Sequence, residues 1–230
     1  MPFYQSRGRL PNKRHIQFRD DEGNLYWEEL ISREGFSHIY SNVYHVHPPT
    51  AVKKVGKIDP VKMEPWDQEH RHHHLNSRSL NHKGDAISSR VPLFFNSDVI
   101  LSKATASDSM DYLYRNGQFD ECLFIHGGKG TLKTNFGTLK LTYGDYAIIP
   151  RGVIWQLDVD EPLELFIVET HGPIETPNRY RNTLGQLLEH APYSERDIRT
   201  PEFETLHSEG SIEVKVRLAQ GLQSYEYKHH

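Results

Sequence analysis

The chain has 230 residues, of which 36% are hydrophobic and 25% charged, and its formal net charge is −4. Such a chain is expected to fold around a core, and its slight acidity disfavours nucleic-acid binding, which depends on neutralising phosphates. No segment approaches the roughly 18 apolar residues of a membrane helix, and the polar start, with Arg7 and Arg9, does not resemble a signal peptide. Cys122 is the only cysteine, which excludes an internal disulfide and favours a reducing compartment. We therefore expect a cytoplasmic enzyme or binding protein.

Residues 1–90 are predicted to form β arms and a connector. Apolar pieces at 25–27 and 43–47 favour short strands, and the two prolines after the second piece end it, since proline cannot donate to a strand ladder. Residues 51–90 are rich in lysine, serine and asparagine and are predicted to form a surface connector. Its histidine-rich part contains His70, His72, His73 and His74. Histidines of an exposed connector bind metal only weakly, so no functional site is assigned to them.

Residues 91–172 are predicted to form a β-barrel. Short runs rich in β-branched and aromatic residues follow one another, separated by turns such as Asn116-Gly117 and Gly127-Gly128. No helical period lies between them. This spacing predicts an antiparallel sandwich or barrel, most naturally a jelly roll. The eight runs are 99–106, 110–114, 119–125, 130–134, 138–141, 145–149, 154–159 and 163–169.

Residues 173–230 are predicted to form a linker followed by a hairpin. Short helical turns are expected at 183–190 and 194–198, with Ser194 as an N-cap. Apolar residues alternate with polar ones over 212–218, and 222–227 follows after a turn, which indicates a half-buried hairpin. No later segment is available to cover its apolar face. We therefore expect this hairpin to begin a second β domain that the chain does not complete.

The spacing of residues in the barrel resembles the two motifs of the cupin superfamily. Glu121 lies seven residues before Gly128, as in the first motif, and Gly144, Pro150 and Gly152 match the second. In metal-binding cupins the first motif supplies two histidines and a glutamate, and the second supplies one more histidine. The resemblance implies a mainly β fold, a cupin or jelly-roll β-sandwich.

The metal ligands of the cupin motifs are missing. Trp155 stands where the later histidine would be. A lone carboxylate, Glu121, cannot hold iron, zinc or manganese tightly, because such sites use three or more donors in fixed geometry. We therefore predict a barrel without metal, filled by aromatic packing around Trp155 and Phe124. The positions of the paired histidines hold other residues in either register: Tyr114 and Asn116, or Arg115 and Gly117.

The remaining reactive side chains are given structural interpretations. His45 and His47 have a ligand-like spacing, but no carboxylate partner can be named for them. His126 precedes two glycines and is interpreted as a turn residue. Cys122 lies in an apolar run without a basic neighbour and is interpreted as a buried core thiol. No phosphate-binding loop, nucleophile elbow or Ser/His/Asp arrangement is found.

The whole chain resembles the N-terminal part of the homogentisate 1,2-dioxygenase family. The resemblance is carried by several segments that occur in the family's order. They are Leu25-Tyr26-Trp27-Glu28-Glu29-Leu30, 145–150 followed by Arg151-Gly152, Glu169-Thr170-His171-Gly172, Leu184-Gly185, Arg196-Asp197 and 225–230. Each motif alone is weak, but their order is consistent throughout.

The family resemblance implies a function for a longer protein. Family members are bicupins whose first cupin is structural and whose second binds Fe(II) through two histidines and a glutamate. They cleave the ring of homogentisate, a small aromatic acid, to maleylacetoacetate in tyrosine and phenylalanine breakdown, and they assemble as trimers paired into hexamers. The family's iron ligands are expected beyond His230, so no catalytic, cofactor-binding or metal residue is assigned here. The 230-residue chain alone is predicted to be inactive.

Two other functions remain open from the sequence. The chain could be a non-catalytic cupin that binds a small aromatic ligand or a protein partner, which would require the hairpin edge to be buried by dimerisation. It could also be an isomerase or decarboxylase with a metal in the barrel, which Trp155 and Asn116 disfavour.

Overall fold

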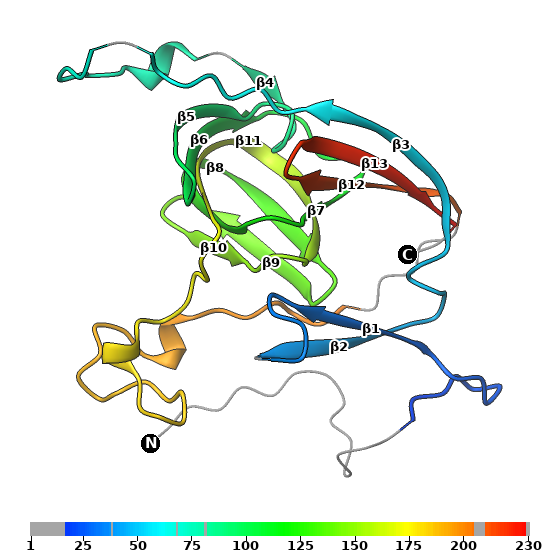
Figure 1. Cartoon of the computed structure of the whole chain (residues 1–230). Helices are drawn as coiled ribbons and strands as arrows, with labels where there is room; N and C mark the ends of the chain where they lie inside the picture. Colours follow the sequence, from blue (N-terminus) through cyan, green and yellow to red (C-terminus); the bar gives the residue numbers. More distant parts are fainter. Residues whose placement is uncertain (1–16, 38, 68, 81, 205–209, 229–230) are drawn as a thin grey trace.

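The computed structural model describes residues 17–37, 39–67, 69–80, 82–204 and 210–228. Within these residues the secondary structure is almost entirely β, interrupted by three short 3-10 turns. The described part contains no helix long and apolar enough to cross a bilayer. The prediction of a mainly β, jelly-roll type of chain is confirmed (Figure 1).

The barrel is built on two long strands, β8 (Asp120–Thr134) and β11 (Ile154–Thr170), which pair antiparallel along most of their length. Each covers two of the predicted short runs. The register of the pair shifts between Val159 and Leu165, and β8 bends opposite this point at Gly128. Gly128 has a φ of 83°, and a Cβ there would lie 2.0 Å from the carbonyl oxygen of Pro162. Only glycine fits this bend, which gives a physical reason for the glycine of the first motif.

Four further strands complete the barrel. β10 (Tyr146–Ile149) and β9 (Gly137–Thr142) pair with β8, while β6 (Val99–Ala106) and β7 (Leu113–Asn116) pair with β11. Two strands lie beside β6: β4 (Lys83–Gly84) and β5 (Val91–Phe95).

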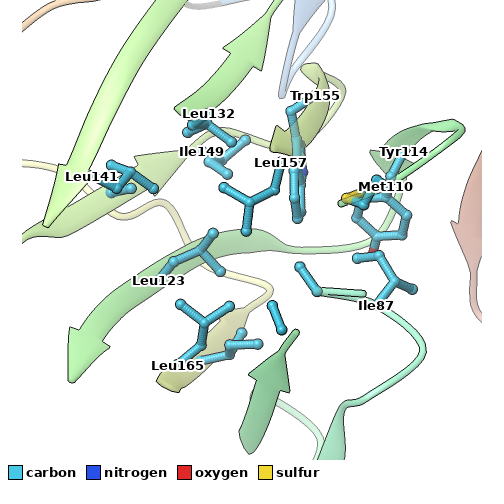
Figure 2. Close-up of a cluster of buried hydrophobic side chains, with 14 of the residues drawn as sticks. Ile87, Met110, Tyr114, Leu123, Leu132, Leu141, Ile149, Trp155, Leu157 and Leu165 are labelled. Atoms are coloured by element: carbon cyan, nitrogen blue, oxygen red, sulfur yellow. The ribbon is translucent and has the colours of Figure 1, made fainter. Parts of the chain in front are cut away.

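The strands alternate between an inner and an outer face. Along β8, Glu121 and Leu123 are fully buried, whereas Cys122 and Phe124 are only partly buried on the opposite face. Phe124 therefore does not fill the barrel as predicted, and Cys122 is a half-buried thiol rather than a core residue. Figure 2 shows the inner face, where aliphatic side chains gather together with Tyr114 and Trp155.

Apolar side chains also line the outer face. The register places Tyr146, Phe124 and Phe166 side by side on β10, β8 and β11. The next row runs through Ile148, Cys122, Val168 and Leu101 to Phe94. We call these residues the outer apolar face. Several are well exposed, with Tyr146 at 69% and Phe94 at 54%.

The predicted C-terminal hairpin is confirmed as β12 (Ile212–Leu218) and β13 (Gly221–Tyr227). β12 pairs in parallel with β7, and β13 pairs with β3 (Val52–Pro60). The outer edge of the hairpin is therefore paired with an earlier strand rather than left open. That strand, β3, lies within residues 51–90, which were predicted to form a connector. All three predicted domains contribute strands to one sheet, and the division at residues 90 and 172 stays a prediction.

The remaining elements are short. β1 (Trp27–Ser32) and β2 (Tyr40–His45) form a separate two-stranded hairpin. The expected turn after Ser194 is a 3-10 turn, Glu195–Asp197, with Ser194 and Asp197 forming a capping box. The expected helical turn at 183–190 is instead made of non-helical turns. The other two 3-10 turns are Ser77–Ser79 and Asn178–Tyr180.

Candidate functional site: a buried ion-pair cluster in the barrel

The carboxylate of Glu121 lies at the centre of the candidate site, and its side chain is 0% exposed. Its Oε1 atom accepts a hydrogen bond from Arg90 Nη1 at 2.6 Å. Its Oε2 atom accepts one from Trp155 Nε1 at 3.1 Å. Both oxygens of the motif glutamate are therefore engaged, one by a guanidinium and the other by the indole that stands in place of histidine.

Arg90 reaches the cluster from the turn before β5. Its side chain is 10% exposed, and its Nε atom donates to the carbonyl of Ala86 at 3.0 Å. The guanidinium lies over the ring of Tyr114, 5.5 Å from the centroid, in cation–π geometry. Burial disfavours the charged form of Arg90, but the carboxylates of Glu121 and Glu169 and the ring of Tyr114 together outweigh burial and raise the pKa of Arg90 above its already high ordinary value. Arg90 is therefore a permanent cation inside the barrel.

A second carboxylate, Glu169, lies beside Glu121 at the paired position of β11. Its Oε1 atom is 3.6 Å from Arg90 Nη1 and accepts a hydrogen bond from Asn116 Nδ2 at 2.9 Å. Burial raises the pKa of Glu169, and Glu121 raises it further, while Arg90 and Arg217 act in the opposite direction. Two buried glutamates thus face the guanidinium of Arg90, and Arg217 adds a second positive charge that acts on Glu169.

The cluster does not fit the donor set of a transition metal. The indole of Trp155 has only an N–H donor and no lone pair to offer. Asn116 Oδ1 already accepts from the backbone nitrogens of Gln118 and Phe119, which turns its Nδ2 toward Glu169. The described residues contain no group of three or more His, Cys, Asp or Glu side chains that could hold a metal ion.

The sequence identified part of this cluster and missed the rest. Glu121 and Trp155 meet as the motif spacing suggested, and the ring of Trp155 packs edge-on against Tyr114 with centroids 5.2 Å apart. Arg90 was missed because no periodic pattern links it to β8. Glu169 could have been identified from the sequence, because it shares the inner face of its strand with Leu165 and Ile167. A carboxylate on a buried face needs a partner.

Two ion pairs that share the carboxylate of Glu29 hold the N-terminal hairpin. His45 Nε2 lies 2.9 Å from Glu29 Oε2, so the histidine does have a carboxylate partner that the sequence did not reveal. Arg115 Nη2 donates to the other oxygen of Glu29 at 2.7 Å. His47 lies two residues beyond the end of β2.

The other predicted residues lie apart from the cluster. His126 is exposed at the bend of β8, with its ring 6.1 Å from that of Phe124. The histidine-rich part of the connector is exposed, and the ring of His73 lies against Trp66 at 5.0 Å. Burial raises the pKa of the Cys122 thiol. The hydrogen bonds to the Glu121 carboxylate come instead from Arg90 and Trp155.

Comparison with known proteins gives three kinds of match. A family model described as "Homogentisate 1,2-dioxygenase N-terminal" matches residues 88–201. A Saccharolobus solfataricus protein named "Putative dioxygenase" is 37% identical over 232 residues, covering 100% of this chain and 60% of that protein. A cupin protein from Bacteroides fragilis is 18% identical, with a TM-score of 0.36 over 49% of this chain and 93% of that chain. A cupin-2 domain protein from Shewanella frigidimarina is 17% identical, with a TM-score of 0.33 over 36% and 79%.

Proposed function

Because residues 88–201 belong to the homogentisate 1,2-dioxygenase N-terminal family, we propose that this chain is the structural cupin part of a homogentisate 1,2-dioxygenase-like enzyme. The chain spans about 60% of the length of the curated relative that it matches. In this proposal Fe(II) and the aromatic acid bind to a part of the enzyme outside these 230 residues. Ring cleavage to maleylacetoacetate, in tyrosine and phenylalanine breakdown, is the reaction that the family implies.

The observation that carries the proposal is the ion pair inside the barrel. In a metal-binding cupin the glutamate of the first motif must be free to coordinate the ion. Here both oxygens of Glu121 accept hydrogen bonds from Arg90 and Trp155, and Arg90 brings a positive charge to the same place. A divalent ion would have to displace a buried cation that is already neutralised, which is costly. The barrel therefore fits a structural role, in which it supports a neighbouring catalytic domain.

The proposal also covers assembly and location. The family implies a homo-oligomer, a trimer or hexamer, and the outer apolar face is the surface that supports contact with a second copy. Monomeric proteins seldom expose apolar patches that extend over several strands. The single cysteine supports a cytoplasmic location.

Three observations test the proposal. Metal analysis of the purified 230-residue chain is expected to find no stoichiometric ion, and oxygen uptake with homogentisate and added Fe(II) is expected to stay at background. A stoichiometric iron that depends on Glu121 would contradict it. Reading the gene past the codon for His230 is expected to reveal a further cupin with His-x5-Glu and a later histidine. The non-catalytic cupin remains the alternative if the codon for His230 is followed by a stop.

A further inference from the structure

Strands β12, β13 and β3 form an amphipathic sheet beside the barrel (Figure 1). Residues directly opposite each other on paired strands lie on the same face of a sheet. The registers of β12 with β13 and of β13 with β3 therefore give three rows of side chains that cross all three strands on one face. We call this surface the C-terminal apolar face. Its rows are Ile212, Tyr227 and Val52; Val214, Tyr225 and Val55; and Val216, Gln223 and Ile58.

The opposite face of the same three strands is charged. There, the row between the first two apolar rows consists of Glu213, Glu226 and Lys54. Lys53 and Lys57 also lie along β3, which stands at the end of the described strand order. Lysines on an edge strand disfavour the addition of a further strand. The C-terminal apolar face is thus the surface of these strands that is suited to contact with another domain.

The C-terminal apolar face is buried at one end only. Val214 on β12 is 1% exposed, whereas Val55, at the other end of the same row, is 55% exposed. The polar groups on this face are compatible with burial. Tyr225 Oη donates to Gln223 Oε1 at 2.7 Å, and Gln223 Nε2 donates to the carbonyl of Gly56 at 3.0 Å. A domain that covered the face would leave these groups with their hydrogen bonds intact.

The place where the chain leaves the sheet indicates what covers this face. Tyr227, in the first row, is the last residue of β13, and His230 follows three positions later. The curated relative is longer, since this chain covers 60% of it. In the proposed function a second cupin follows His230, so its chain starts beside the C-terminal apolar face. A cupin is itself a β-sandwich, and two sheets pack through their apolar faces about 10 Å apart.

We propose that the C-terminal apolar face is the docking surface for the catalytic cupin of the longer protein, which packs on it sheet against sheet. This inference rests on the proposed function and adds the surface through which the two cupins meet. Because β12 pairs with β7, a domain docked here would be held directly against the first barrel. The outer apolar face, on other strands, is left for contact with a second copy.

Labelling of single cysteines with a maleimide tests the docking surface. Cys122→Ser removes the natural thiol, and Val55→Cys then places one thiol on the C-terminal apolar face. This thiol is expected to react rapidly in the 230-residue chain. In the longer protein it is expected to react more slowly by about tenfold or more, because the docked domain must first open. Lys54→Cys, on the opposite face, is the matched control and is expected to react at the same rate in both proteins.

A pair of charged substitutions provides a second measurement. Val55→Lys combined with Ile58→Lys places ammonium groups where a docked domain would desolvate them. The unfolding midpoint of the 230-residue chain is expected to stay unchanged, because Val55 and Ile58 are 55% and 39% exposed. In the longer protein the double variant is expected to separate the two cupins, so that a protease cuts between them faster than in the natural protein. Lys54→Ala is the control and should leave the rate of cutting unchanged.

The outcomes distinguish this inference from the proposed function. If the longer protein consumes oxygen with homogentisate but Val55→Cys reacts equally fast in both proteins, only the docking surface is wrong. A protected Val55→Cys in a longer protein without this activity would support the docking surface and contradict the proposed function. If Val55→Cys is already protected in a dimeric 230-residue chain, a second copy covers the face and the inference is overturned. A stop codon directly after His230 would overturn both proposals.

Discussion

The carboxylate of Asp120, at the start of β8, lies 2.9 Å from the guanidinium of Arg33, which follows β1 in the loop of the N-terminal hairpin. The same carboxylate accepts hydrogen bonds from the backbone nitrogens of Arg151 and Ile174, at 2.8 and 3.0 Å. Asp120 therefore joins the N-terminal hairpin, the Arg151-Gly152 turn and the linker after β11. Its side chain is 2% exposed, so these contacts are made away from water.

Replacing Asp120 with alanine is expected to destabilise the fold by about 3–5 kcal/mol, because the buried charge partner of Arg33 and the acceptor of two backbone N–H groups are lost together. Urea denaturation measures this change. Arg33→Ala is the matched control and is expected to cost less, since Arg33 is 21% exposed and the backbone contacts of Asp120 remain. Equal decreases in the free energy of unfolding of the two variants would contradict the bridging role of Asp120.

Gly128→Ala is expected to cost more than about 3 kcal/mol, since the new Cβ meets the Pro162 carbonyl oxygen at 2.0 Å and φ is positive. Gly144→Ala is the control, because its φ is 87° but nothing lies within 4 Å of the new Cβ. That variant is expected to lose only about 1–2 kcal/mol, the cost of the backbone conformation alone. Thermal unfolding of both variants separates steric contact from backbone strain.

Stability is expected to fall as the pH drops from about 4.5 toward 2, in part through Glu29. Burial opposes ionisation of Glu29, but hydrogen bonding to His45 and the charge of Arg115 outweigh it and lower its pKa to about 2. A carboxyl whose pKa is lower in the folded state stabilises the fold above its unfolded value and loses this contribution as the pH falls through the folded value. Glu29→Gln is expected to flatten the stability curve between pH 4.5 and 2 in urea titrations. An unchanged slope in that range would show that the ion pair does not contribute.

Charge placed on the outer apolar face is expected to prevent self-association. Tyr146→Lys combined with Phe166→Lys puts two ammonium groups on either side of Phe124 in the patch, where they would be desolvated by a second copy. Light scattering after size exclusion is expected to show a lower mass for this variant than for the natural chain. Leu184→Lys is the control, because Leu184 is 83% exposed in the linker, away from the sheet. An unchanged mass in the double variant would exclude this face as the interface.

Much of the fold could be predicted from the sequence, because the barrel strands are short, regularly spaced and bounded by turns. β3 was missed for a physical reason: eight of its nine residues are exposed, so it lacks the apolar and polar alternation by which strands are recognised. The expectation that Phe124 fills the barrel was wrong. Glu121 and Phe124 are three positions apart, and side chains of a strand alternate, so the two residues lie on opposite faces.

The candidate site could be predicted only where its residues follow motif spacing. Glu121 and Trp155 were identified because the cupin spacing fixes their places. The arginine that neutralises Glu121 comes from a turn 31 residues earlier, and its approach depends on how that turn packs against the barrel. Tertiary pairing of this kind has no local signature, so sequence reasoning could identify the missing metal ligands but not the cation that replaces them.

The pairing of β3 with β13 affects how the chain folds during its synthesis. Gln223 Nε2 donates to the carbonyl of Gly56, a contact between positions 167 residues apart. During synthesis β3 emerges early and must wait for its partner until residues 221–227 have left the ribosome. Contacts this distant in sequence slow folding, and an unpaired strand is prone to aggregation while it waits. Three lysines, Lys53, Lys54 and Lys57, lie along β3, and their mutual repulsion would keep nascent chains from pairing with one another in that interval.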